Sequence, residues 1–368
     1  MFEHVLDNVN FNFQINRILS FGDEGCKREE VLNAMNGVVT IDDWYKAWLK
    51  IALIAEDEKR YLHSMYYYRM AEFFLLPNHL EKNHMYTKIK EMFAKYYPHV
   101  VKEKIPYKQG YLPCIRIKKP NAKHTLIIHG GFDSFIEEFY LLFEKLTSLQ
   151  INIILFEGSG QGEALKQGLY FNEKWEQQVG IILDYYKLDS IILMGVSWGG
   201  FFALRAAAFE KRIKHVIAHG ILYDGLDVQQ HLIKQPARLG LKLLFFLKCK
   251  SIINTLVFKK MGQDSLIKWG ITHGMYITNT KTPYDYLQAI KKHNLKGLLK
   301  KINQDVLLLT GEKDHYIPLW QFNYLRKNLL NARVESRMFT EKEGGEQHCQ
   351  VGNYEIAINH IINWIKRL

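Results

Sequence analysis

Cysteine and proline are scarce in this sequence. Its 368 residues include only four cysteines and eight prolines. The cysteines stand far apart without Cys-x-x-Cys spacing, which argues against a disulfide framework and against a cysteine-based zinc site. His-Glu-x-x-His pairs, a P-loop Gly-Lys-Ser/Thr and a signal-peptide pattern are also missing, as is any uncharged apolar run of about 18 residues. We therefore expect a soluble cytoplasmic protein without a metal, a cofactor or stable membrane insertion.

Positive charge is in excess, but only locally. The chain has 49 Lys and Arg against 38 Asp and Glu, a net charge of +11, which raises the question of nucleic-acid binding. Residues 231–301 alone contain fourteen Lys and Arg and two acids, a balance of +12 that leaves the rest of the chain at −1. No nucleic-acid-binding module accompanies this segment, so we predict no nucleic-acid partner. Its lysines could extend from packed helices into solvent, attract an anionic substrate, or contact lipid.

The first third of the chain is rich in aromatic residues and is predicted to be helical. Residues 1 to about 105 show no strand signal. Thr40 followed by two aspartates predicts a helix start, and apolar residues from Trp44 to Ala55 recur at helical spacing. We expect an N-terminal helical cap domain over residues 1–105.

The remainder of the chain, residues 106–368, alternates short apolar runs with helical patterns. This alternation predicts an α/β fold with a mostly parallel sheet that is covered by helices on both faces. Ser134-x-x-Glu137 resembles a capping box and predicts a helix over 134–149. The alternation is interrupted at about 222–300, where so long an insert usually forms a lid.

A candidate nucleophile lies between a predicted strand and a helix. Ile191–Met194 leads into Gly195-Val196-Ser197-Trp198-Gly199, and an alanine-rich helix follows. In this G-x-S-x-G pattern the serine occupies a sharp turn, so the residues two positions away must be small. The pattern in this context predicts Ser197 as a nucleophile.

A nucleophilic serine needs a base, and the base needs an acid that orients it. With the strand–turn–helix pattern around the serine, the expected chain order is serine, acid, histidine. Asp314 follows a predicted strand at 306–309, and His348 lies between the last strand and the last helix. Asp224, which follows the preceding strand, is the alternative acid. We predict Ser197, Asp314 and His348 as the catalytic residues.

Two backbone N–H groups are needed to bind the negative charge that develops on the substrate oxygen. One is expected from Trp198, directly after the nucleophile. The other is expected from the glycine-bearing loop that follows an early strand, with Phe132 favoured and Gly131 as second choice. We interpret His129 as a support for this loop rather than a base.

Another glycine-rich segment, 156–162, reads Phe-Glu-Gly-Ser-Gly-Gln-Gly. Its spacing is not the G-x-G-x-x-G of a dinucleotide-binding loop, and it does not follow the first strand of a βαβ unit. We interpret it as a tight turn that shapes the site.

These features resemble the α/β-hydrolase superfamily. The chain is most similar to its branch with an N-terminal helical domain, which includes fermentation/respiration-switch-type esterases, 2,6-dihydropseudooxynicotine hydrolase and fungal polyketide-shortening hydrolases. The segments that carry the resemblance are Trp44 to Trp48, Tyr68–Phe74, Gly130–Ser134, 156–162, Gly195–Gly200 and Glu346–Cys349. The resemblance implies an α/β-hydrolase domain over 106–368 and an active site roofed by the insert and the N-terminal helices.

We predict a serine hydrolase that cleaves an ester, an amide or a carbon–carbon bond next to a carbonyl in a small acyl compound. An acylaminoacyl-type peptidase is one alternative, although the N-terminal region is too short for the β-propeller of such enzymes. A non-catalytic binding protein with the same fold is another. The expected binding partner is the small-molecule acyl substrate, and the sequence is compatible with either a monomer or a homodimer.

Overall fold

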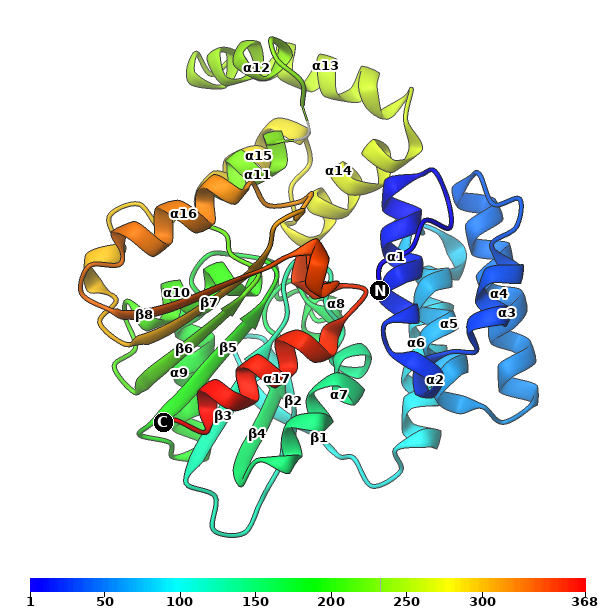
Figure 1. Ribbon diagram of the computed structural model, residues 1–368. Coiled ribbons are helices and arrows are strands. Elements are labelled where there is room, and N and C mark those ends of the chain that lie inside the picture. The colour runs from blue at the N-terminus through cyan, green and yellow to red at the C-terminus, as the bar shows by residue number, and fades with distance from the viewer. Residues whose placement is uncertain (232) are drawn as a thin grey trace.

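An eight-stranded sheet forms the centre of the molecule (Figure 1). The computed structural model describes residues 1–231 and 233–368. Its strands lie in the order β1-β2-β4-β3-β5-β6-β7-β8. β1 and β2 run antiparallel to their neighbours, and the strands from β4 to β8 are parallel. The strand bounds are β1 Lys102–Tyr107, β2 Gly110–Ile117, β3 His124–His129, β4 Ile151–Phe156, β5 Ile191–Val196, β6 Ile213–His219, β7 Asp305–Gly311 and β8 Arg333–Phe339.

Each face of the sheet has its own hydrophobic core. Alternate residues of a strand point to opposite faces, so Leu126 and Ile128 belong to one cluster and Ile127 to the other. The first cluster includes α7, α17 and the N-terminal helices, and the second includes α9, α10, α16 and the insert. The helices outside the N-terminal region and the insert are α7 Ile136–Glu144, α8 Gly162–Lys166, α9 Trp175–Tyr186, α10 Gly199–Ala207, α16 Leu319–Asn328 and α17 Tyr354–Ile365.

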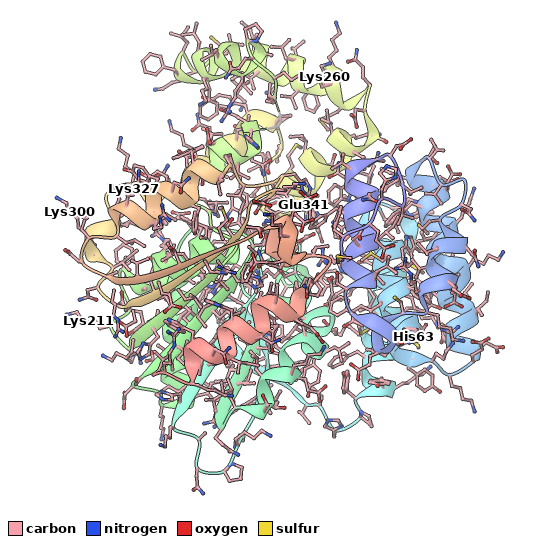
Figure 2. All side chains as sticks on the ribbon, viewed as in Figure 1. His63, Lys211, Lys260, Lys300, Lys327 and Glu341 are labelled. Carbon is pink, nitrogen blue, oxygen red and sulfur yellow. The ribbon has the colours of Figure 1, made fainter. Side chains whose placement is uncertain are left out.

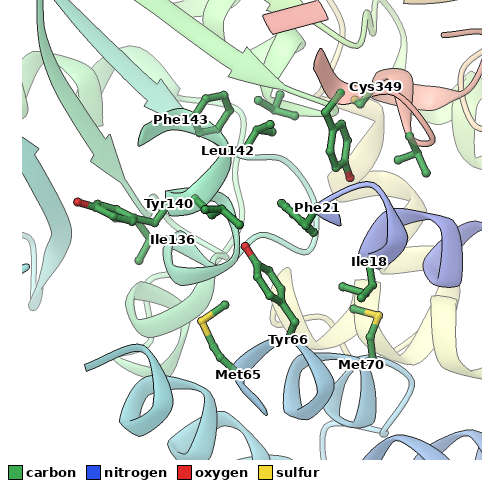
Figure 3. Packing of buried hydrophobic residues seen from close by; sticks show 14 of the residues in the cluster. Ile18, Phe21, Met65, Tyr66, Met70, Ile136, Tyr140, Leu142, Phe143 and Cys349 are labelled. Carbon is green, nitrogen blue, oxygen red and sulfur yellow. The ribbon is translucent and has the colours of Figure 1, made fainter. Parts of the chain in front are cut away.

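The chain before β1 is a group of helices that packs beside the sheet (Figure 1). Thr40 and Asp43 form a capping box at the start of α4, and Trp44 and Trp48 are fully buried, as the sequence predicts. Tyr66 of α5 stacks on Phe21 and donates to the Glu138 carbonyl of α7, so both regions share one core (Figure 3). These helices are α1 Val9–Leu19, α2 Gly22–Gly25, α3 Arg28–Ala34, α4 Ile41–Asp57, α5 Tyr61–Phe73 and α6 Leu80–Tyr96.

The insert between β6 and β7 consists of helices that lie above the ends of the strands (Figure 1). The apolar stretch 241–258 is divided between two helices, with Lys248 at a φ of 56° between them. No helix in residues 1–231 and 233–368 is long and apolar enough to cross a membrane. The insert helices are α11 Gly225–His231, α12 Ala237–Phe246, α13 Lys250–Met261, α14 Ser265–Ile277 and α15 Pro283–Lys291.

Two local predictions were wrong. Strand β1 begins at Lys102, inside the segment expected to be helical; its Pro106 is tolerated because β1 is an edge strand. Helix α7 begins at Ile136 without a side-chain cap. Ser134 does not cap it, because its hydroxyl accepts the Gly131 N–H at 2.7 Å, and the Ile136 N–H donates to Glu157 instead.

Candidate active site

Ser197 occupies the turn between β5 and α10 in a left-handed conformation, with a φ of 61°. This conformation is unfavourable for a residue with a side chain, and a surrounding close-packed turn must hold it. A Cβ on Gly195 would stand 1.9 Å from the Gly199 carbonyl oxygen, and one on Gly199 would stand 2.7 Å from the Gly130 carbonyl oxygen. Strand and helix can therefore approach only because both positions are glycine, which leaves the half-buried serine at the end of the strand.

The structure brings Ser197, His348 and Asp314 into one hydrogen-bonded chain. His348 Nε2 lies 2.9 Å from Ser197 Oγ, and His348 Nδ1 lies 2.6 Å from Asp314 Oδ2. The other Asp314 oxygen accepts the N–H groups of Tyr316 and Ile317 at 3.0 and 2.9 Å, which fixes the carboxylate. With the ring proton on Nδ1, directed at Asp314, Nε2 is free to accept the serine proton.

Asp224, the alternative acid, lies elsewhere. Its carboxylate accepts from the Asn294 side chain at 2.8 Å and from the Asp227 N–H at 3.1 Å, at the start of α11. Among the residues described, it makes no hydrogen bond to His348. The geometry therefore favours Asp314 as the residue that orients the imidazole.

The environment couples the charges of His348 and Asp314. Burial by itself lowers the pKa of His348, but the adjacent Asp314 carboxylate outweighs it, so the pKa is raised well above the ordinary value. Burial raises the pKa of Asp314, and His348 with the two backbone N–H groups brings it below its ordinary value. The two groups thus favour the ion pair of imidazolium and carboxylate, the state that His348 would reach after accepting a proton.

If His348 is the base of a hydrolysis reaction at Ser197, that activity should be lost on the acid side of the pH profile with a midpoint above the usual histidine pKa of about 6.5. The base acts as neutral imidazole, and a raised pKa keeps it protonated to higher pH, so activity falls as the pH drops through that raised value. In Asp314→Asn the midpoint should move to lower pH. The dependence of kcat/KM on pH measures both, and a wild-type midpoint below 6.5 would contradict the expectation.

The backbone N–H groups proposed to bind the oxyanion differ in availability. Gly131 donates to Ser134 Oγ, so its N–H is engaged within the loop. The N–H groups of Phe132 and Trp198 have no acceptor among the residues described. The Gly131 Cα lies against the Trp198 amide, because a Cβ there would stand 2.7 Å from its nitrogen. The loop and the turn thus meet beside Ser197, and Phe132 with Trp198 is the pair that remains free to donate.

The glycine-rich segment 156–162 holds this loop in place. Gln161 Nε2 donates to the carbonyls of Gly130 and Gly131 at 2.9 and 2.8 Å. Glu157 accepts the N–H groups that open α7 and α8, and burial together with the nearby Glu137 carboxylate raises its pKa to about 7. Sequence reasoning recognised the turn but missed the role of Gln161, whose only signal was its place beside the glycines.

Two buried histidines support the site without belonging to the hydrogen-bonded chain. His129 lies behind the turn, and its Nδ1 is 3.2 Å from the Gly130 carbonyl; burial lowers its pKa to about 3. His293, which the sequence did not single out, accepts the Trp198 indole N–H at 3.0 Å. Burial lowers its pKa to about 3 as well, so both rings are neutral near pH 7.

Helices of the N-terminal region and of the insert border the site. The Phe13 ring of α1 lies 5.3 Å from the Tyr316 ring and 6.3 Å from the His348 ring. On the other side, His273 of α14 lies 5.5 Å from the Phe132 ring. Trp269 of the same helix donates to the Phe73 carbonyl of α5 at 2.9 Å, which joins the insert to the N-terminal helices. No cluster of three or more metal-binding side chains occurs within residues 1–231 and 233–368.

The family model described as "alpha/beta hydrolase fold" matches residues 123–346, more than half of the chain. The strand order and the turn at Ser197 agree with this match. The protein belongs to the α/β-hydrolase family, and it is a hydrolase.

Curated relatives match almost the whole chain. A hydrolase of Aspergillus aculeatus, acrC, is 24% identical over 96% of this chain and 95% of its own length. The 20-hydroxy-prefusarin hydrolase FUS2 of Gibberella moniliformis is 26% identical over 96% and 95%. The N-terminal helices therefore lie within the matched region of these relatives.

Solved structures show the same fold over the N-terminal helices and the α/β domain together. The 2,6-dihydroxy-pseudo-oxynicotine hydrolase superposes with a TM-score of 0.70 at 17% identity, over 95% of this chain and 94% of that one. Wild-type AbyA5 superposes with a TM-score of 0.68 at 15% identity, over 91% and 88%.

Proposed function

We propose that this protein is a serine hydrolase that cleaves a small acyl compound through an acyl-serine intermediate. The observation that carries the proposal is the hydrogen-bonded chain from Ser197 Oγ through His348 to Asp314, with distances of 2.9 and 2.6 Å. A serine on a strained turn, a base in contact with it and an orienting carboxylate are what nucleophilic acyl transfer requires.

In the first step, Ser197 Oγ attacks the substrate carbonyl carbon, and its proton passes to His348 Nε2. The carbonyl electron pair moves onto the oxygen, which the N–H groups of Phe132 and Trp198 bind. When the carbonyl re-forms, the bond to the leaving group breaks and the leaving group takes the proton from His348. Water then attacks the acyl carbon in the same way: it gives a proton to His348, and Ser197 leaves with that proton.

The roof of the site determines which substrates enter. The helices before β1 act as a cap domain, and the insert at about 222–300 acts as a lid on the hydrolase domain, which begins with β1. Phe13, Phe132 and Trp269 give the surrounding walls an aromatic character. A small acyl compound with an apolar portion fits such walls better than a peptide strand, whose backbone would need polar partners.

Reaction with a fluorophosphonate probe tests the proposal. The probe phosphonylates a serine that a neighbouring base activates, so the wild type should be labelled and Ser197→Ala should not. Ser190, an exposed residue directly before β5, provides a matched control, and Ser190→Ala should be labelled as the wild type is. An unlabelled wild type would contradict the proposal and favour a non-catalytic binding protein. Equal labelling of Ser197→Ala would contradict it as well, because the probe would then react at another residue.

We expect that the positive charge of the insert does not steer the substrate. Lys250 pairs with Asp285 at 3.0 Å, and Figure 2 shows Lys260 on the outer part of the insert, away from the sheet. A Lys259→Gln/Lys260→Gln variant should keep the ratio of kcat/KM for an anionic and a neutral ester within about twofold, since exposed charges far from the site are screened by salt. A severalfold fall in this ratio at low salt, abolished at high salt, would show that steering operates.

A further inference from the structure

The loop of residues 130–134, which carries the Phe132 N–H, is held from two directions. From the sheet side, Gln161 holds the Gly131 carbonyl at 2.8 Å. This carbonyl and the Phe132 N–H share one planar peptide unit and point in opposite directions, so Gln161 sets the direction of that N–H. From the other side, Arg69 of α5 donates through Nη2 to the Asp133 carbonyl at 2.6 Å.

Arg69 is buried and all three of its nitrogens are engaged. Its Nε donates to Glu138 of α7 at 2.9 Å, and its Nη1 donates to Glu72 at 2.6 Å. The side chain is 3% exposed, and the guanidinium lies 4.1 Å above the centre of the Phe135 ring. Such a planar group can bond in three fixed directions at once, whereas the single ammonium of a lysine cannot reproduce this arrangement.

We propose that Arg69 is a positioning residue for hydrolysis, through which the N-terminal helices hold the Phe132 N–H toward the substrate oxyanion. The inference rests on the proposed function, since it presumes an oxyanion at this place. Gln161 holds the carbonyl that precedes Phe132, and Arg69 holds the carbonyl of the residue after it. Of these two contacts, only that of Arg69 comes from outside the α/β domain. Neither Arg69 nor Asp133 belongs to the hydrogen-bonded chain at Ser197; in this proposal their contact fixes the position of the loop.

The test compares Arg69→Lys with Arg60→Lys. Arg60 precedes the same helix and makes comparable ion pairs, with Glu30 at 2.9 Å and Glu58 at 2.6 Å, but it is remote from the loop. Arg69→Lys should lower kcat for a p-nitrophenyl ester by about 10- to 100-fold with little change in KM, which approaches the effect of losing one oxyanion donor. Arg60→Lys should stay within about twofold of the wild type.

A trifluoromethyl ketone inhibitor separates positioning from general damage. Serine adds to it to form a tetrahedral oxyanion, so its inhibition constant should rise in Arg69→Lys by about the factor by which kcat falls. An activity loss that comes from a partly unfolded population would leave the inhibition constant of the remaining active molecules unchanged. Addition of ethylguanidinium to Arg69→Ala should restore part of kcat, and the same addition should leave Arg60→Ala unchanged.

Folding is checked by thermal melting. If Arg69→Lys does not fold, the double variant Arg69→Met/Glu138→Gln takes its place with the same expectations. It removes one charge of each sign; Arg17, which also pairs with Glu138, keeps Asp133 at 3.6 Å, and Glu72 keeps Lys82. A folded Arg69 variant with kcat and inhibition constant near those of Arg60→Lys overturns the proposal. So does a failure of both variants to fold, because Arg69 is then purely structural. A wild type that the fluorophosphonate probe does not label contradicts the proposed function instead.

Discussion

Replacement of Ser197 by alanine should reduce kcat/KM for an activated ester by about 10⁴- to 10⁶-fold. In the proposed mechanism this side chain contributes the atom that bonds to the substrate. Among the residues described, His348 Nε2 has no second hydroxyl in contact that could replace it; besides Ser197 Oγ it contacts Cys349 Sγ at 3.5 Å. His348→Ala should cost a similar factor, because the serine cannot lose its proton without the base. The two losses should not add in the double variant, since each removes the same reaction step.

The measurement uses purified variants and steady-state rates with a p-nitrophenyl ester. Ser190→Ala is the control: it also removes a serine hydroxyl, but at the residue before the N-terminal end of β5, and it should keep the wild-type rate. Thermal melting should show that Ser197→Ala is folded. Serine and alanine both carry a Cβ, so the φ of 61° at this position is no more strained in the variant than in the wild type. If Ser197→Ala retained more than about 1% of the activity, a different residue would be the nucleophile.

The second large effect is expected at Asp314. Asp314→Asn preserves the shape of the side chain but loses the carboxylate that holds the proton on His348 Nδ1. The imidazole then presents the wrong tautomer to Ser197, and kcat should fall by about 10⁴-fold, the factor known for this substitution in serine proteases.

Asp224→Asn is the matched control for this substitution. The amide oxygen of asparagine can keep the hydrogen bond to the Asp227 N–H, and only the bond from Asn294 is lost. Neither contact involves His348, so kcat should stay close to that of the wild type. If instead Asp224→Asn lowered kcat by the larger factor, the acid would be assigned to the wrong strand.

Much of the fold follows from short stretches of sequence. The apolar runs that became β3 to β8 and the capping box of α4 are local patterns, because hydrophobic periodicity and caps act over a few residues. Edge strand β1 escaped detection because Pro106 interrupts a short run with only one neighbouring strand. The insert was located, but its division into separate helices was not foreseen.

For the candidate site, the sequence by itself determined the order serine, acid, histidine and the glycines that the turn at Ser197 requires, since each of these residues lies in a recognisable local pattern after a predicted strand. Only the tertiary structure decided which groups meet. Ser134 takes the Gly131 N–H and leaves that of Phe132 free, Asp314 rather than Asp224 faces His348, and Arg69 reaches the Asp133 carbonyl from a helix outside the sheet. These contacts join residues that are far apart in the chain, and they depend on how whole elements pack, which a local pattern does not specify.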